Sequence, residues 1–192
     1  MDFKVLQSKM PQIDIIDKNL PVITKSAWDA LIASNNPPYL FSYGNTVVRL
    51  ITGENGQVSI DGLSKYKMRH VLARCAIFRT IKKGELEIDL PPLYLINDLL
   101  AHSNYPLPKL SRIVHAPIFS QDGKLHLTPG YSFSTECYFN LDGRVQIPKV
   151  PISPSEGDVS RAKGMIRELL YDFPFIGESE FANAISLYLS RF

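Results

Sequence analysis

Residues 106–140, PLPKLSRIVHAPIFSQDGKLHLTPGYSFSTECYFN, alternate strand-forming runs with turn signals. An extended strand is predicted over 111–119, followed by a tight turn at Asp122-Gly123 and a returning strand over 125–128. The Asp-Gly pair favours the positive φ angles of a two-residue hairpin turn. With that turn, His126 is expected opposite Phe119.

A second hairpin is predicted directly after the first. Pro129-Gly130 closes the returning strand, 135–139 forms a new strand, and Asp142-Gly143 turns it into 144–147. Isolated two-stranded hairpins are marginally stable in water, so both hairpins must pack on neighbouring elements.

Composition is typical of a folded domain. The chain has 192 residues, 45% of them hydrophobic, which is enough for one domain with a core plus an appended piece. No apolar run approaches the ~20 residues that span a bilayer, and the N-terminus lacks a signal-peptide pattern, so a cytoplasmic protein is predicted. Cys75 and Cys137 are expected to be buried free thiols.

The positive charge is concentrated in one segment. The net charge is only +2, yet residues 62–84 contain seven cations and no acid, so the rest of the chain is acidic on balance. Such a patch is the electrostatic pattern of a phosphate-binding surface. With the histidine in the same segment, the candidate nucleic-acid-binding residues are Lys65, Lys67, Arg69, His70, Arg74, Arg79, Lys82 and Lys83.

The first third of the chain predicts a helix and a hairpin. Thr24 or Ser26 is expected to cap a helix that runs to about Ser34. Strands over 39–43 and 46–52 are expected to be joined by a Gly44-Asn45 turn, with a third strand over 57–61. Residues 1–20 are expected to form an arm or an edge strand.

A second helix and a basic hairpin follow. The helix is predicted over 63–75 with Asp61 as N-cap, an apolar stripe, and Lys67, His70 and Arg74 on another face. A strand over 76–81, a basic turn and a strand over 85–90 come next. In that last strand Glu85, Glu87 and Asp89 are expected to point outward and Leu86, Ile88 and Leu90 inward. A helix followed by a basic-tipped hairpin is the order of elements in a winged-helix module.

The C-terminal part is predicted to be helical. Pro91-Pro92 starts a short helix over 93–102. Residues 148–154 are proline-rich and are expected to form a stiff linker, after which Ser155 and Asp158 form a variant capping box for a helix. The predicted fold class is therefore α+β, with an accessory domain over 1–147, a possible sub-boundary near 104, and helices over 155–192.

Several motifs resemble a known family. The central stretch with Ala116-Pro117, Asp122-Gly123 and Pro129-Gly130-Tyr131, and the run LYDFPF at 170–175, resemble the region upstream of the ATPase module in primase-helicases of phages, plasmids and integrated elements. Weaker similarity covers Trp28, residues 36–41, Leu90-Pro91-Pro92 and Leu99-Leu100. The chain departs from the family pattern at Ser120-Gln121, Ser132 and Glu136, the last standing where glycine is usual.

The resemblance implies a non-catalytic accessory domain of a virus-type replicative helicase. It implies the protein's own ATPase domain as a partner and a possible homo-oligomer, which forms a ring in the full-length protein. DNA, single- or double-stranded, is expected as a partner because of the charge distribution. The chain contains no GxxxxGK[ST] loop, so ATP and magnesium are expected only in an ATPase module beyond Phe192, and neither a cofactor nor a catalytic residue is expected here. The last predicted helix lacks a C-cap, which favours a fragment of a longer protein.

Two other classes of function stay open. One is a protein-interaction or oligomerisation module whose basic patch faces an acidic partner. The other is a divalent-metal enzyme of nucleic acids, because Glu85, Glu87 and Asp89 share one strand face. Such a carboxylate row more often protects an edge strand from aggregation. Zinc and Ser-His-Asp chemistry lack their spacings.

Overall fold

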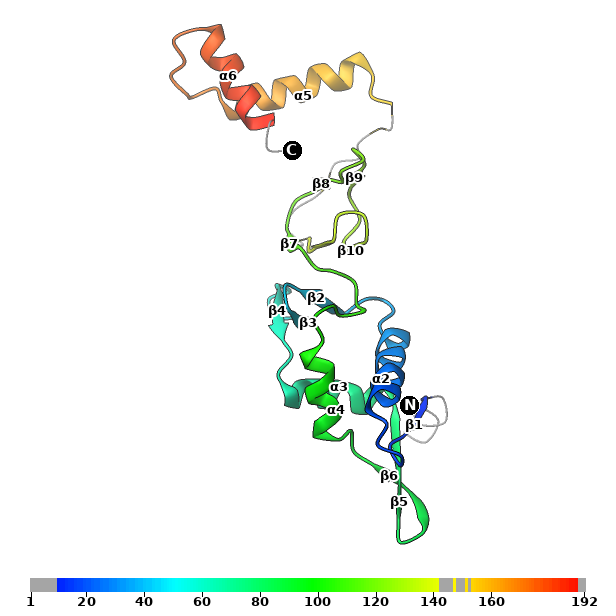
Figure 1. The fold of residues 1–192 in the computed structure, drawn as a ribbon. Coiled ribbons are helices and arrows are strands. Elements are labelled where there is room, and N and C mark those ends of the chain that lie inside the picture. Colours follow the sequence, from blue (N-terminus) through cyan, green and yellow to red (C-terminus); the bar gives the residue numbers. More distant parts are fainter. Residues whose placement is uncertain (1–9, 142–146, 148–150, 152, 190–192) are drawn as a thin grey trace. The chain divides into compact units, whose positions relative to one another are not determined.

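The computed structural model describes residues 10–141, 147, 151 and 153–189, and it has an α+β architecture (Figure 1). The chain divides into two units. One comprises Met1–Ala116 and Thr128–Asp142, and the other comprises Pro117–Leu127 and Gly143–Phe192. The α+β prediction is confirmed, whereas the winged-helix likeness and the domain boundaries stay predictions. No helix in the described ranges is both long and apolar enough to cross a membrane.

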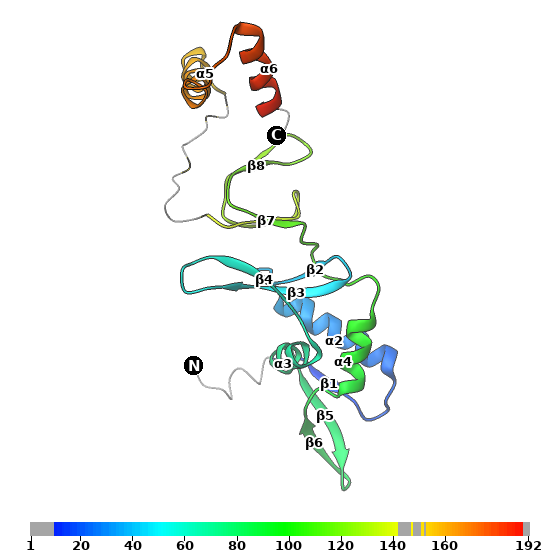
Figure 2. The same cartoon turned by 90° about the vertical axis from the view of Figure 1, so that its left-hand side faces the viewer.

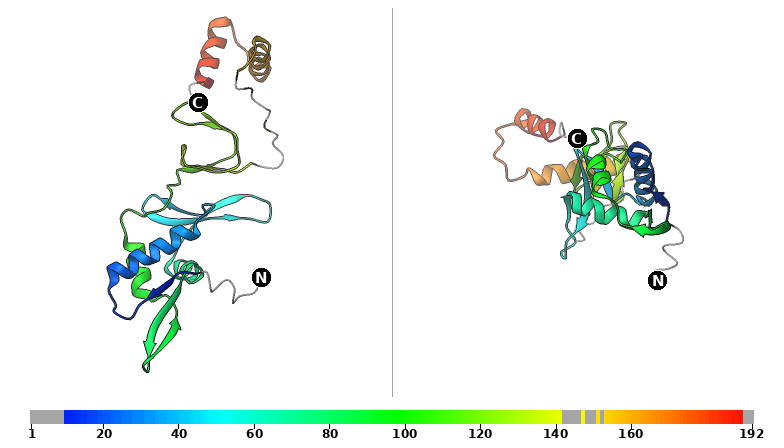
Figure 3. Two further views of the ribbon diagram at one scale, coloured as in Figure 1. Left: turned by 90° about the vertical axis from the view of Figure 1, so that its right-hand side faces the viewer. Right: turned by 60° about the horizontal axis from the view of Figure 1, so that its bottom comes forward.

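Three helices form the centre of the first unit and contact one another pairwise (Figures 1 and 3). Their bounds are α2 (Leu20–Ser34), α3 (Lys65–Cys75) and α4 (Leu93–Ala101). Leucines from all three are fully buried, including Leu31, Leu72, Leu95 and Leu99. The main hydrophobic core therefore lies between these helices.

The starts of α2 and α3 differ from the prediction. α2 begins at Leu20, four residues before Thr24, because Pro21 sits in its first turn, where the missing N–H is not needed. α3 is capped by Ser64, whose hydroxyl accepts a hydrogen bond from the Lys67 backbone N–H. Asp61, the predicted cap, belongs instead to a strand.

That strand is part of an antiparallel three-stranded sheet. The strands are β2 (Leu40–Tyr43), β3 (Thr46–Thr52) and β4 (Val58–Gly62), in this order. The Gly44-Asn45 turn between β2 and β3 is confirmed, with Gly44 at φ 55°. Phe41 and Val48 of this sheet are buried with Leu110 in a second, smaller core.

A second sheet has the order β10-β11-β7, with bounds β7 (Arg112–Val114), β10 (Gly130–Ser132) and β11 (Cys137–Phe139). The predicted strand over 111–119 is wrong as one element, since β7 ends at Val114. Among the described residues β11 pairs antiparallel with β10 and parallel with β7. Most of the predicted partner 144–147, and the Asp142-Gly143 turn, lie outside the described residues.

A third sheet carries the basic hairpin. Its strands are β1 (Gln12–Asp14), β5 (Ile77–Lys82) and β6 (Glu85–Asp89); β1 is parallel to β5, and β5 is antiparallel to β6. β1 confirms the edge strand expected near the N-terminus. Ile13 and Phe78 are buried on the face toward the helices. Away from its base, the hairpin extends past the helices (Figures 1 and 2).

The predicted burial of β6 is wrong. Leu86, Ile88 and Leu90, expected inside, are 55%, 65% and 61% exposed. Leu86 and Ile88 lie on the sheet face opposite Phe78, because successive side chains of a strand point to opposite faces; Leu90 follows the end of β6. The helical core covers only the Phe78 face, and only near the base of the hairpin.

The second unit contains a hairpin and two helices: β8 (Ile118–Phe119), β9 (Leu125–His126), α5 (Glu156–Leu169) and α6 (Glu178–Leu189). His126 pairs with Ile118 rather than Phe119. The register is shifted by one residue because the turn has five residues, Ser120 to Lys124. The Ser120 N–H donates to the Lys124 carbonyl, and the Lys124 N–H donates to Ser120 Oγ. The Ser155–Asp158 capping box of α5 is confirmed.

Truncating a core leucine should destabilise the chain far more than truncating a hairpin leucine. Leu72→Ala removes a side chain with no exposure and should lower the free energy of unfolding by about 2–5 kcal/mol. Leu86→Ala, at the exposed hairpin, should change it by less than about 1 kcal/mol. Urea unfolding followed by circular dichroism measures both. Equal losses would contradict the assignment of the core.

Candidate nucleic-acid interface

The burial of one side of α3 decides which of its side chains face outward. Met68, Val71, Leu72 and Cys75 form its buried stripe. On the opposite side Tyr66 is 75% exposed, and Lys65, His70 and Arg74 are exposed as well. α3 therefore presents a face of cations and one aromatic ring to solvent.

Arg74 is positioned by the C-terminal turn of α3. Its Nη1 donates to the His70 backbone carbonyl at 2.9 Å. Arg74 itself lies in the last turn of α3, where the partial negative charge of the helix dipole attracts cations. The arrangement anchors one guanidinium nitrogen on the helix, and the exposed remainder of the guanidinium can still bind an anion.

Lys67 is held by an acid from the neighbouring strand. Its Nζ lies 2.5 Å from Asp61 Oδ1, and Arg49 Nε lies 2.9 Å from Asp61 Oδ2. The pKa of Asp61 is lowered, chiefly because Lys67 and then Arg49 donate hydrogen bonds to its carboxylate. Lys67 therefore joins α3 to the sheet of β3 and β4.

Arg69 makes a different connection. Its Nε donates to the backbone carbonyl of Pro91 at 2.8 Å, which ties α3 to the segment before α4. No ion pair involves Arg69 among the described residues, but its charge helps to lower the pKa of Asp89. This side chain has a structural contact and retains a full positive charge.

The hairpin cations are accompanied by acids. Arg79 bonds to Asp14 on β1 at 2.7 and 2.8 Å, and Lys82 lies 3.1 Å from Asp89. The pKa of Asp89 is lowered first by the N–H of Leu90 and then by Lys82. Lys83, at the tip, has a left-handed φ of 53° and no ion pair in the described part of the chain.

The structure thus separates the eight predicted site residues into two groups. Lys67, Arg79 and Lys82 pair with carboxylates that lie outside residues 62–84 in the sequence, and Lys67 shares its partner Asp61 with Arg49. Lys65, His70 and Arg74 remain exposed along α3, Arg69 is half-buried on the same helix, and Lys83 lies at the hairpin tip. Their role in binding nucleic acid stays a prediction.

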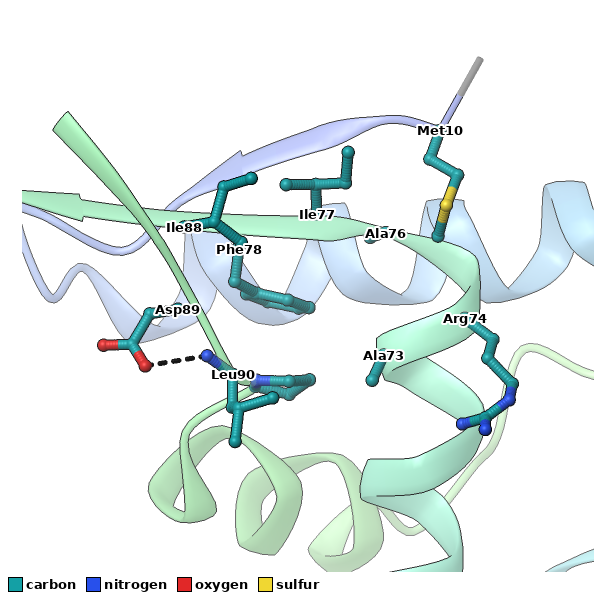
Figure 4. Close-up of a pocket in the computed structure, with 10 residues that line it drawn as sticks. Met10, Ala73, Arg74, Ala76, Ile77, Phe78, Ile88, Asp89 and Leu90 are labelled. Atoms are coloured by element: carbon teal, nitrogen blue, oxygen red, sulfur yellow. Dashed lines mark hydrogen bonds between the residues drawn. The ribbon is translucent and has the colours of Figure 1, made fainter. Parts of the chain in front are cut away.

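An apolar pocket beside α3 is a feature that the sequence analysis missed. It has a volume of about 340 Å³ and lies between the end of α3, with Ala73 and Arg74, and the end of β6, with Ile88 and Leu90 (Figure 4). Ala76, Phe78 and Pro91 also line it. The sequence did carry a signal for this pocket, namely the alternating apolar residues of β6, which continue into Leu90 and Pro91.

The remaining candidate chemistry concerns metal ions and the two cysteines. Within the described ranges no three His, Cys, Asp or Glu side chains are arranged to hold a metal ion, and this includes the row of Glu85, Glu87 and Asp89. Cys75 and Cys137 are buried free thiols, as predicted.

Comparisons with known proteins found no matching family model, no matching curated protein and no matching solved structure.

The ion pairs of Asp61 should make stability depend on acidity. Because the pKa of Asp61 is lowered by folding, these pairs stabilise the fold above its ordinary value of 3.8 and lose that effect as the pH falls below it. Asp61→Asn should therefore lower the melting temperature near pH 7, and the difference from wild type should shrink as the pH falls below 3.8. Thermal unfolding at a series of pH values measures this.

The control variant is Asp29→Asn. Asp29 pairs with Lys25 within α2, and both side chains are more than half exposed, so the pair contributes little to stability. A pH-independent difference between Asp61→Asn and wild type would contradict the structural role of the Asp61 carboxylate.

Proposed function

We propose that this chain is a non-catalytic DNA-binding and subunit-positioning domain of a mobile-element replication helicase or primase-helicase. The observation that carries the DNA contact is the exposed part of α3, where Lys65, Tyr66, His70 and Arg74 are open to solvent and the three basic side chains make no ion pair among the described residues. Phosphate contacts of this kind supply affinity without base specificity.

The dimensions of this face suit a DNA backbone. Lys65 and Arg74 are nine residues apart, which is roughly 13 Å along the helix axis at 1.5 Å per residue. This length is about four base-pair steps at 3.4 Å per step. With about 100° between successive residues, Lys65 and Arg74 lie about 180° apart around the helix axis, and Tyr66 and His70 lie between them on the exposed side.

The link to a helicase rests on the sequence resemblance. One structural detail supports it: Glu136 has a left-handed φ of 52° at the position where the resembled family usually has glycine, the residue that adopts this conformation without strain. In this proposal α5 and α6 lead toward the ATPase module, which holds ATP and magnesium, and subunits assemble as a ring.

A second candidate function is a protein-interaction module. The exposed apolar face of the β5–β6 hairpin favours it, because contiguous apolar surface of this kind often marks an interaction site. Light scattering distinguishes self-association from binding to DNA.

Charge reversal on α3 should weaken DNA binding. Lys65→Glu combined with Arg74→Glu should lower the affinity for a ~20-base-pair duplex and for single strands by at least about tenfold at low salt. Each lost phosphate contact means that one counterion fewer is released on binding. The slope of log affinity against log salt concentration should therefore become less negative by about 2. Fluorescence anisotropy measures both quantities.

The matched control is Lys25→Glu combined with Lys109→Glu, which changes the net charge equally but lies off α3. Both control side chains are exposed. The proposal requires this variant to bind clearly better than the α3 variant. Equal losses would show that only net charge matters, and no binding by wild type would reject the DNA contact.

A further inference from the structure

We propose that the free edge of β6 binds an extended segment of a partner protein in which basic and apolar residues alternate. β6 is an outer strand of the sheet β1-β5-β6, and within the described ranges no strand pairs with its other side. Such an edge offers backbone N–H and C=O groups to an added strand. The strand edge and its two faces use residues that the DNA proposal does not need; Arg74, which that proposal does use, lines only the adjoining pocket.

One face of the hairpin supplies the apolar contacts. The pairs Ile81–Leu86 and Arg79–Ile88 lie directly opposite each other across β5 and β6. Ile81 is 51% exposed, and Leu86, Ile88 and Leu90 are more so. An added strand would place every second side chain beside Leu86 and Ile88 on this face, where apolar residues remove the most apolar surface from water.

The other face supplies the charge. Glu85 and Glu87 are exposed and have no ion pair among the described residues, whereas Asp89 is paired with Lys82. The remaining side chains of an added strand would lie beside this row. Directly opposite residues on neighbouring strands interact, and opposite charges there are favourable. Basic residues are therefore selected at these alternate positions.

The apolar pocket continues this surface toward α3. Ile88 and Leu90 line it together with Met10, Ala73 and Phe78 (Figure 4). In strand addition, backbone hydrogen bonds give affinity, and pockets for alternate side chains give specificity. An apolar side chain at one end of the bound segment would fit this pocket.

Charge excludes two other occupants. Antiparallel pairing of β6 with β6 of a second copy, centred on Glu87, would place Glu87 opposite Glu87 and Glu85 opposite Asp89, and like charges in those positions are destabilising. Nucleic acid is disfavoured because Glu85 and Glu87 repel phosphates. A strand in which basic and apolar residues alternate would place its basic side chains beside Glu85 and Glu87 and its apolar side chains beside Leu86 and Ile88.

The test is a titration of the full chain with a capped synthetic peptide of alternating lysine and valine, about eight residues long. A peptide of alternating glutamate and valine is the control ligand. The protein variant is Glu85→Lys combined with Glu87→Lys, and its control is Asp17→Lys combined with Glu54→Lys. Because two charge contacts change sign, the β6 variant should bind the lysine peptide at least about tenfold more weakly and should gain affinity for the glutamate peptide.

Amide hydrogen exchange identifies where the peptide binds. The lysine peptide should slow amide exchange within Glu85–Asp89 and leave β4 unchanged. The inference is overturned if the peptide binds the β6 variant and wild type equally, if it fails to bind wild type at millimolar concentration, or if protection appears elsewhere. Self-association of wild type that Glu85→Lys with Glu87→Lys abolishes would overturn it in favour of a second copy.

Discussion

The first unit depends on the burial of the apolar stripe of α3 against α2 and α4. Met68 and Leu72 are completely buried there, and each large core side chain contributes about 2 kcal/mol when removed from water. Because this stripe must face inward, the rotation of α3 is fixed, and its cations must face outward. The same packing leaves the far part of the β5–β6 hairpin beyond the reach of the core.

Local signals predicted much of the fold. The Gly44-Asn45 turn, the apolar stripe of α3 and the capping box of α5 are each encoded within a few residues, and all three are present. What the sequence did not reveal is pairing between distant segments. β1 is parallel to β5 although some 65 residues separate them, and no periodicity in either strand indicates its partner.

The ion pairs of the candidate site were missed for the same reason, because they join residues that are distant in the sequence or lie on different elements. Residues 62–84 contain no acid, but the fold brings Asp61 to Lys67, Asp14 to Arg79 and Asp89 to Lys82. A segment that is free of acids in sequence is therefore not free of them in space. Only the exposed face of α3, whose orientation follows from its own apolar stripe, could be inferred from the sequence.

The hairpin explains why alternation alone misled the prediction for β6. A period of two shows that the two faces of a strand differ, but it does not show which face is covered. Here the apolar face is exposed, and an apolar edge strand without protection would pair with copies of itself. Glu85 and Glu87 oppose that pairing by charge repulsion while leaving the backbone edge open. The acidic row therefore restricts what can bind this edge rather than closing it.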